Sequence, residues 1–243
     1  MSRSYKHNGL ELPSVTQIIS DVSNSSVPLM QWSSNCCIEW VKENCYLDIV
    51  HSWCKNSWIV PDEKLDKARF AYKEISKQAL AVGSEVHSAI EEWLTKGKQK
   101  PLPESFSDNM VNEFNNAFSA FLQWEKTVKF KPIFLEKTVY GDCWAGTLDM
   151  TCYLDGKIYV IDFKTSKAIY TNDYGAQIAA YRSCIPEAEG CGILRLDKAT
   201  AKYEWKDFSK RYERDLKRFE AMVVLYMLNH PRIAKKAGFN ENY

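Results

Sequence analysis

Apolar residues recur every three or four positions in several long stretches of the chain, a spacing that places them along one face of an α-helix. A further short helix is expected after Ser14, because Ser14 can act as its N-cap and Gln17 follows three residues later in a capping-box arrangement. The other expected helices cover residues 36–53, 62–80, 83–96, 108–126, 173–184 and 209–228. The first third of the chain is therefore predicted to be helical.

Aromatic and β-branched residues dominate a second set of shorter segments, which is typical of β-strands. These segments cover residues 132–140, 144–154, 157–165, 190–197 and 201–208. Asp155 and Gly156 separate two of them and give a strong signal for a two-residue hairpin turn. The order of helices, strands, a helix, strands and a helix predicts an α/β fold of the mixed α+β type, in which helices flank both faces of a central mixed β-sheet.

The hairpin turn determines which residues face each other across its two strands. Counting back from the turn, Asp149 is placed opposite Asp162. Like charges directly opposite each other destabilise a sheet, so something must offset their repulsion. A hard divalent cation such as Mg²⁺ would do so because it selects carboxylate oxygens, and Lys164, which shares the face of Asp162, would help. An alternative is equally compatible with these residues: Asp149 lies at a solvated strand end and forms an ordinary ion pair with Lys164.

Composition bounds the size and the class of the protein. The chain has 243 residues, of which 45% are hydrophobic and 13% aromatic, enough to bury a substantial core in one domain. Within it we expect a helical N-terminal elaboration over residues 1–82, a core over residues 83–208, and a C-terminal helix and tail over residues 209–243. The formal net charge of +1 supplies no large positive field, so any nucleic acid must be held by a local basic surface.

The sequence lacks signals of membrane insertion or secretion. No run approaches the roughly 18 to 20 apolar residues of a membrane span, and the polar start lacks the apolar stretch of a signal peptide. The eight cysteines include no CxxC pair, so neither a zinc finger nor a thioredoxin-type motif is indicated, and free thiols are the default. We expect a cytoplasmic protein with no membrane partner.

Four short motifs occur in order between residues 83 and 182. They are G-x-x-x-H ending at His87, G-T-L-D ending at Asp149, D-F-K from Asp162 to Lys164, and Q-x-x-x-Y from Gln177 to Tyr181. Together they resemble the PD-(D/E)xK nuclease superfamily, and specifically its RecB-type exonuclease branch. The stretch LPSVTQII near the start is similar to that of small stand-alone members from phages and mitochondria. No proline precedes Asp149 and the second acid is an aspartate instead of a glutamate, but both variants suit the RecB-type branch.

The resemblance implies a restriction-endonuclease-like core and a metal-dependent DNA nuclease. The expected activity is that of an exonuclease, which hydrolyses phosphodiester bonds from free ends of single-stranded or resected DNA in replication, repair or recombination. Such chemistry needs cations that neutralise phosphate, a deprotonated water and stabilisation of the departing oxygen. The implied cofactor is Mg²⁺ or Mn²⁺, and the implied partners are DNA and replication or recombination proteins. The implied metal ligands are His87, Asp149, Asp162 and the main-chain carbonyl of Phe163.

The resemblance also assigns roles around these ligands. Lys164 would orient the attacking water or stabilise developing negative charge. Gln177 and Tyr181 share a helix face and would reach the substrate or the lysine, and Arg182 would bind substrate beside them. The implied catalytic group is Asp149, Asp162, Lys164, Gln177 and Tyr181. Taken alone, His87 would instead be interpreted as a core residue on an apolar helix face.

Two alternative functions stay open. A non-catalytic nucleic-acid-binding module could retain the nuclease fold, although intact acids and an intact lysine argue against such decay. Some relatives hold an iron–sulphur cluster with four cysteines near the C-terminal end, but only Cys184 and Cys191 lie in that region here. Glu136 is a possible accessory acid, yet an exposed strand glutamate is equally compatible, and the predicted site does not include it.

Candidate DNA contacts outside this site are basic or aromatic. Cationic side chains recur at helical spacing in two regions and could neutralise backbone phosphates, but interspersed acids favour an ordinary solvated face. Tryptophans in the first third could stack on unpaired bases or simply pack in the core. These residues are Lys210, Arg211, Arg214, Lys217 and Arg218, several lysines between Lys64 and Lys77, and Trp32, Trp40 and Trp53.

Overall fold

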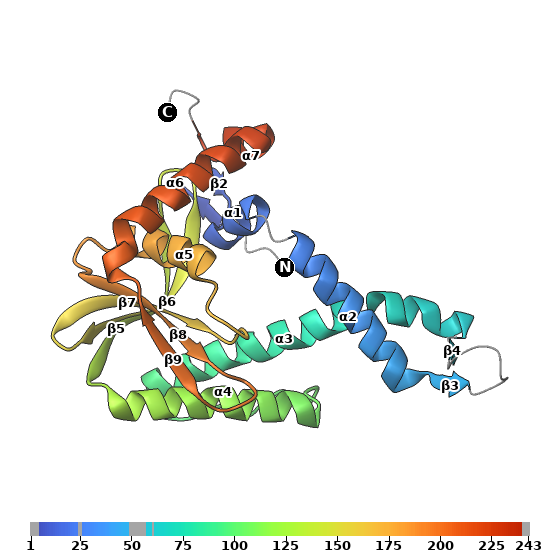
Figure 1. Ribbon diagram of the computed structural model, residues 1–243. Helices are drawn as coiled ribbons and strands as arrows, with labels where there is room; N and C mark the ends of the chain where they lie inside the picture. Colours follow the sequence, from blue (N-terminus) through green and yellow to red (C-terminus); the bar gives the residue numbers. More distant parts are fainter. Residues whose placement is uncertain (1–4, 24–25, 49–56, 60, 240–243) are drawn as a thin grey trace. The chain divides into compact units, whose positions relative to one another are not determined.

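The computed structural model describes residues 5–23, 26–48, 57–59 and 61–239, and the chain divides into two compact units (Figure 1). The larger unit combines Met1–Ser23 with Gly83–Tyr243, and the smaller unit is Asn24–Val82. This division places a boundary at residue 82, where the predicted core begins. The first 23 residues belong to the unit that contains the sheet, whereas the sequence predicted them as part of the N-terminal elaboration.

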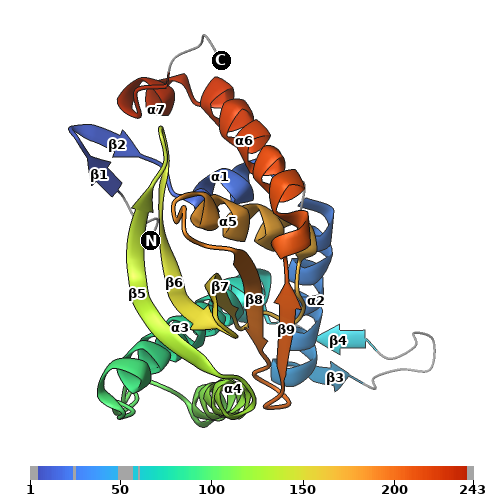
Figure 2. The ribbon, with the colours of Figure 1, turned by 90° about the vertical axis from the view of Figure 1, so that its left-hand side faces the viewer.

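A five-stranded sheet with the strand order β5-β6-β7-β8-β9 forms the centre of the larger unit. Its strands are β5 Phe130–Tyr140, β6 Ala145–Leu154, β7 Lys157–Lys164, β8 Gly190–Leu196 and β9 Tyr203–Asp207. Neighbouring strands are antiparallel except for β7 and β8, which are parallel because the helix α5 (Thr171–Ser183) connects them as a crossover. The sheet is mixed and helices flank both of its faces (Figure 2), so the predicted mixed α/β fold class is confirmed.

Helices from distant parts of the chain cover the two faces of the sheet. On one face, α5 packs against α1 (Val15–Val22) and α6 (Tyr212–Asn229). On the other face, α4 (Asp108–Thr127) packs against β8 and β9. The remaining elements of this unit are the hairpin of β1 (Tyr5–His7) and β2 (Leu10–Leu12), which the sequence did not predict, the 3₁₀ turn η1 (Ser209–Arg211) and α7 (Pro231–Lys236). Within the described residues, no helix combines the length and the apolar character that crossing a membrane requires.

The smaller unit contains α2 (Ser26–Asn44), a hairpin of β3 (Tyr46–Asp48) and β4 (Ser57–Ile59), and the first part of α3 (Asp62–Lys96). The helix predicted to reach residue 53 ends at residue 44. The two helices predicted on either side of Gly83 are one continuous helix, since a glycine in a helix interior costs only about 1 kcal/mol. Trp32 lies edge-on to Tyr72 and Trp40 is half-buried, whereas Trp53 lies outside the described residues.

The turn at Asp155 and Gly156 sets the register as predicted. Both residues have positive φ, 49° and 83°, as a tight turn between twisted strands requires. The ladder between β6 and β7 runs from the turn to the pair formed by Met150 and Ile161. Asp149 and Asp162 follow at the next position on each strand, just beyond the last ladder pair.

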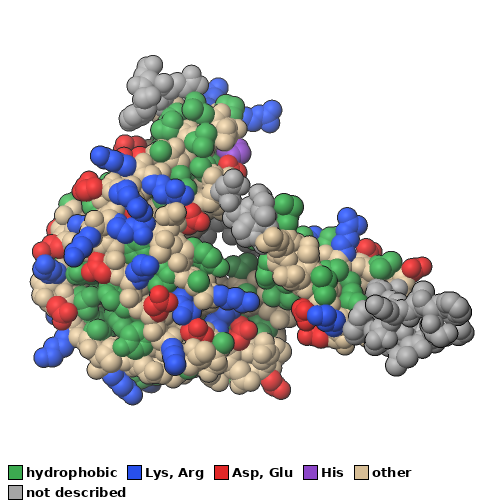
Figure 3. All heavy atoms as spheres, viewed as in Figure 1, with side chains coloured by type: hydrophobic (Ala, Val, Ile, Leu, Met, Phe, Trp, Pro, Cys, Tyr) green, Lys and Arg blue, Asp and Glu red, His purple; other side chains and the backbone are tan. Residues whose placement is uncertain are grey.

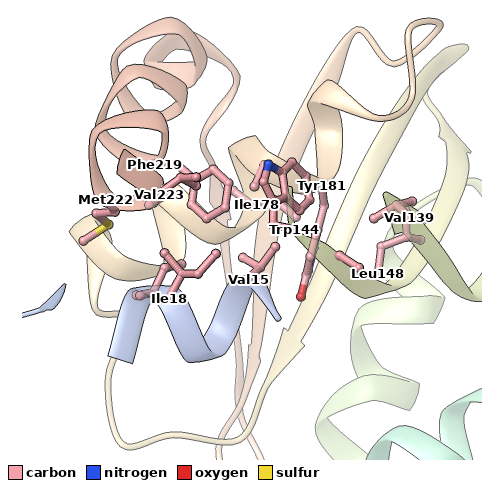
Figure 4. Close-up of a cluster of buried hydrophobic side chains, with 14 of the residues drawn as sticks. Val15, Ile18, Val139, Trp144, Leu148, Ile178, Tyr181, Phe219, Met222 and Val223 are labelled. Atoms are coloured by element: carbon pink, nitrogen blue, oxygen red, sulfur yellow. The ribbon is translucent and has the colours of Figure 1, made fainter. Parts of the chain in front are cut away.

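Side chains from three helices fill the space above one face of the sheet. Ile18 of α1, Ile178 of α5 and Phe219 of α6 belong to one buried cluster, to which the sheet contributes residues such as Leu148 (Figure 4). The predicted N-cap of α1 is confirmed, because the Ser14 Oγ accepts a hydrogen bond from the backbone N–H of the residue three positions later, at 3.0 Å. Residues on the opposite face of β7 pack on α4, where the rings of Phe163 and Phe121 meet edge to face at 5.9 Å.

Gly146 allows α5 to approach the start of β6 closely. A Cβ added to this glycine would lie 2.5 Å from Cε1 of Tyr181, nearer than side chains come in folded proteins. The Tyr181 side chain is only 3% exposed, so the ring has no free space to move into. The glycine of the G-T-L-D motif is therefore needed for the packing of a helix and not for a turn.

The variant Gly146→Ala should lower the free energy of unfolding by about 1 to 3 kcal/mol, because the buried ring has to move. Denaturant titration followed by circular dichroism measures this loss. In the double variant Gly146→Ala/Tyr181→Leu the two losses should not add, since the smaller side chain leaves room for the new methyl group. Additive losses would contradict the direct contact.

Candidate metal and catalytic site

Asp149 is buried where the ladder of β6 and β7 ends. It is 8% exposed, and its Oδ2 accepts a hydrogen bond of 2.6 Å from the backbone N–H of Phe163. Its Oδ1 lies 3.2 Å from Nδ1 of His87, which α3 supplies. The alternative of a solvated strand end with an ion pair between Asp149 and Lys164 is therefore not what forms, because the acid is buried and His87 is its partner.

Asp162 and Lys164 form a second buried pair on β7. Asp162 is 2% exposed, and its Oδ2 lies 2.6 Å from Nζ of Lys164 as an ion pair. From α5, Nε2 of Gln177 donates a hydrogen bond of 3.3 Å to Oδ1 of Asp162 and another of 3.2 Å to the Tyr181 hydroxyl. The predicted catalytic residues are thus brought together, and Gln177 and Tyr181 lie buried beside Asp162, 6% and 3% exposed.

The pKa values of the two acids are shifted in opposite directions. Burial, helped by the negative charge of Asp149, raises the pKa of Asp162 to about 6, although Lys164 acts against this rise. Burial would also raise the pKa of Asp149, but the charge and hydrogen bond of His87, the charge of Lys164 and the N–H of Phe163 outweigh it and lower the pKa. The two acids are close enough to influence each other, as the hairpin register predicts.

The same carboxylates raise the pKa values of the two basic groups. Burial alone would lower the pKa of Lys164, yet Asp162 and Asp149 raise it above its ordinary value. At His87, burial also acts to lower the pKa, and the charge and hydrogen bond of Asp149 raise it overall. The His87 side chain keeps 27% of its surface exposed, so the site is open to solvent on the α3 side.

Glu136 joins the site although the sequence-based site did not include it. It has a left-handed φ of 46° in the interior of β5, which is rare for a residue with a side chain. The β5 and β6 strands pair through Leu135 with Met150 and through Lys137 with Leu148, which leaves Glu136 opposite Asp149. One ligand atom each of Glu136, Asp149 and His87 lie within 4.8 Å of one another.

This group fits a divalent cation. Ligand atoms at about 2.0 to 2.6 Å from an ion lie up to roughly 5 Å from one another, which matches the spread of the three groups. Carboxylate oxygens suit Mg²⁺ and Mn²⁺, and imidazole adds affinity for transition metals. Asp162 lies outside this group and instead binds Lys164 and Gln177, so the four predicted ligands do not form a single cluster.

Phe163 contributes backbone groups to the site. Its N–H points to Asp149, and a strand residue in an antiparallel pair directs its N–H and its C=O toward the same neighbouring strand. The carbonyl that the resemblance implies as a ligand therefore faces the Asp149 side. Its ring points to the other face of the sheet, where His87 meets it edge-on at 6.0 Å.

Arg182 lies elsewhere. Its Nε donates to the carbonyl of Ala188, at 3.2 Å, and its guanidinium lies 3.9 Å above the ring of Tyr212. Because these contacts hold Arg182 away from Asp162, its predicted substrate-binding role has no support in the geometry. The seven described cysteines are free, and the only described cluster of three possible metal ligands contains no cysteine, so the site does not fit the iron–sulphur alternative.

The basic face of α6 is largely engaged in ion pairs. Arg211 and Arg214 both bind Oδ1 of the buried Asp215, and Arg218 lies 3.6 Å from Asp173. Figure 3 shows basic and acidic side chains interspersed over the face of the molecule in view. This mixture agrees with an ordinary solvated face more than with a dedicated phosphate-binding surface.

Neither a comparison with models of protein families nor a comparison with curated proteins gives a match for this chain. The interpretation of the site therefore depends on its own residues and their geometry.

Addition of Mn²⁺ should raise the Tm of the protein, because an ion bound only by the folded chain stabilises it by about 2.7 kcal/mol at a hundredfold excess over Kd. Asp149→Asn and Glu136→Gln should each remove most of this rise, and chelation with EDTA should reverse it. Glu104→Gln, at an exposed glutamate outside the site, is the matched control and should respond like wild type. An unchanged Mn²⁺ response in Asp149→Asn would contradict the metal site.

Proposed function

We propose that the protein is a metal-dependent DNA nuclease, acting as an exonuclease on free ends of single-stranded or resected DNA. The observation that carries the proposal is a group of acidic and basic side chains gathered at one end of the ladder of β6 and β7, in an otherwise apolar interior. The group consists of His87, Glu136, Asp149, Asp162 and Lys164. The sequence motifs also support the proposal, because His87, Asp149, Asp162 and Lys164 belong to three of the four.

Three side chains would hold the ion. His87, Glu136 and Asp149 offer an imidazole nitrogen and carboxylate oxygens within reach of one cation. When bound, Mg²⁺ or Mn²⁺ neutralises phosphate charge and lowers the pKa of a bound water, so that a nucleophile forms near neutral pH. The hydrogen bond from the Phe163 N–H fixes one oxygen of Asp149, which leaves the other directed at His87.

Lys164 would act as a cation and not as a base. Its raised pKa keeps it protonated at neutral pH, and its flexible stem places the ammonium group beside Asp162. From there it can orient a water molecule or stabilise negative charge that develops on the phosphoryl oxygens. Gln177 and Tyr181 are best assigned as positioning residues, because Gln177 fixes the carboxylate that in turn holds Lys164.

The substrate and the biological setting are extensions of this proposal. DNA as the polymer, free ends as the point of attack, and a place in replication, repair or recombination with protein partners come from the resemblance of the motifs. A cytoplasmic location is in keeping with the free thiols of the described cysteines, since disulfides form in oxidising compartments.

Cleavage of end-labelled linear DNA with Mg²⁺ or Mn²⁺ should be about 10²- to 10³-fold slower in Lys164→Ala than in wild type. Losses of this size follow when one charge-stabilising group is removed from an active site. Lys157→Ala, an exposed lysine on the same strand, is the matched control and should cleave normally. Equal activity of Lys164→Ala and wild type would refute the assignment. Binding of DNA by wild type without metal-dependent cleavage would favour the non-catalytic module.

Linear single strands should be degraded, while covalently closed circular single strands of the same sequence should persist. An exonuclease needs a free end, and a circle offers none, although its phosphodiester bonds are chemically identical. Gel analysis of both substrates over the same time course with Mg²⁺ measures the difference. Cleavage of both at similar rates would show internal cutting and would replace the exonuclease part of the proposal.

A further inference from the structure

Two tyrosines extend from Lys164 to the surface. The Nζ of Lys164 lies 5.1 Å from the centroid of the Tyr174 ring, on the first turn of α5. The rings of Tyr174 and Tyr170 meet edge to face, with centroids 5.6 Å apart and an interplanar angle of 79°. Tyr174 is half-buried, whereas Tyr170 is 54% exposed. An aromatic surface therefore starts at the ammonium group and ends in solvent.

The Tyr170 side chain does not stabilise the start of α5. It occupies the N-cap position of α5, but its side chain makes no capping hydrogen bond. Serine, threonine, aspartate and asparagine are preferred at this position because their side chains satisfy a free N–H. Asp173, on the first turn of α5, accepts a hydrogen bond from the Ser23 hydroxyl. A large apolar ring at an exposed N-cap, beside a buried polar site, points to binding.

Hydrogen bonds hold the loop that precedes α5 in place, and this loop carries an exposed lysine. The Ser166 hydroxyl donates a hydrogen bond of 2.9 Å to the carbonyl of Ala168, and Nη1 of Arg195 lies 3.3 Å from the carbonyl of Lys167 as a donor. The Lys167 side chain is exposed, three residues after Lys164 and three before Tyr170. The rim of the site thus combines an exposed aromatic ring with an exposed cationic side chain on a hydrogen-bonded loop.

This combination matches the chemistry of an unpaired nucleic-acid strand. Aromatic side chains stack on exposed bases, and neighbouring cations follow the phosphates. In a duplex each base already stacks on its neighbours, so it offers no free face to a ring at the protein surface. An exposed ring at the rim would therefore distinguish single-stranded from double-stranded nucleic acid, but would not distinguish one base sequence from another.

We propose that Tyr170 stacks on an unpaired base next to the scissile phosphate, and that it makes the site selective for single-stranded DNA. The proposal rests on the proposed function, since it specifies the substrate class of the same site. Tyr174 supports the Tyr170 ring from the inner side, and Lys167 neutralises an adjacent phosphate. Tyr170 touches the bound strand but not the reacting atoms.

Binding is measured first, without catalysis. The probes are a fluorescently labelled 15-nucleotide strand and a hairpin duplex of the same sequence, with Ca²⁺ in place of Mg²⁺. Tyr170→Ala should weaken binding of the single strand about tenfold and leave the duplex unaffected, while Tyr170→Phe, which keeps the ring, should stay within about twofold of wild type. Tyr153→Ala, at a tyrosine of 46% exposure on β6, is the matched control and should bind like wild type.

Kinetics with Mg²⁺ then separate this inference from the nuclease proposal. Tyr170→Ala should raise KM for the single strand much more than it lowers kcat, because the ring holds the strand and does not contact the reacting phosphate. Single-strand affinity of Tyr170→Ala equal to that of wild type, or an equal loss in Tyr153→Ala, would overturn the stacking role. If wild type fails to cleave any substrate, the nuclease proposal fails, and the Ca²⁺ binding comparison still decides the role of Tyr170.

Discussion

Two buried carboxylates and the two basic groups that contact them, at the end of one hairpin, are the constraint on which the rest of the site depends. Asp149 and Asp162 lie at facing positions on β6 and β7, each less than a tenth exposed. Their burial is tolerated because each has a basic partner, His87 for Asp149 and Lys164 for Asp162. Breaking such a buried pair by removing one partner costs about 3 to 5 kcal/mol in other proteins, so α3 and the hairpin cannot shift independently without a penalty of that order.

Glu136 adds a third carboxylate to this arrangement. One ligand atom from each of Glu136, Asp149 and His87 lies within 4.8 Å of the others. The left-handed φ of Glu136 costs about 1 to 3 kcal/mol for a residue with a side chain, a kind of strain that concentrates at functional sites. A carboxylate on strained backbone, within reach of a second acid and an imidazole, favours a site that is completed by a divalent cation.

Much of the fold was predictable because its signals are local. The Asp155-Gly156 turn fixed the register of β6 on β7 and so the juxtaposition of two acids far from the turn. Glu136 was not predictable, because its place opposite Asp149 depends on an irregularity in β5 that strand alternation does not reveal. The same limit applies to Gln177 and Tyr181: helical spacing showed that they share a face, but only tertiary packing shows that the face is buried against Asp162.

The helix α5 links the buried chemistry to the rim. Near its middle, Gln177 donates a hydrogen bond to Asp162, and on its first turn the Tyr174 ring lies beside Lys164, with the Tyr170 ring against Tyr174. The helix can shift little, since a Cβ added to Gly175 would lie 2.5 Å from Oδ2 of the buried Asp215 on α6, and the close contact at Gly146 fixes its other end. Because Gln177 and Tyr174 belong to one helix and Tyr170 is its N-cap, the position of a base held at the rim relative to the acid in the interior is set largely by this helix. A strand bound at Tyr170 would therefore present its backbone to Lys164 in a constant geometry.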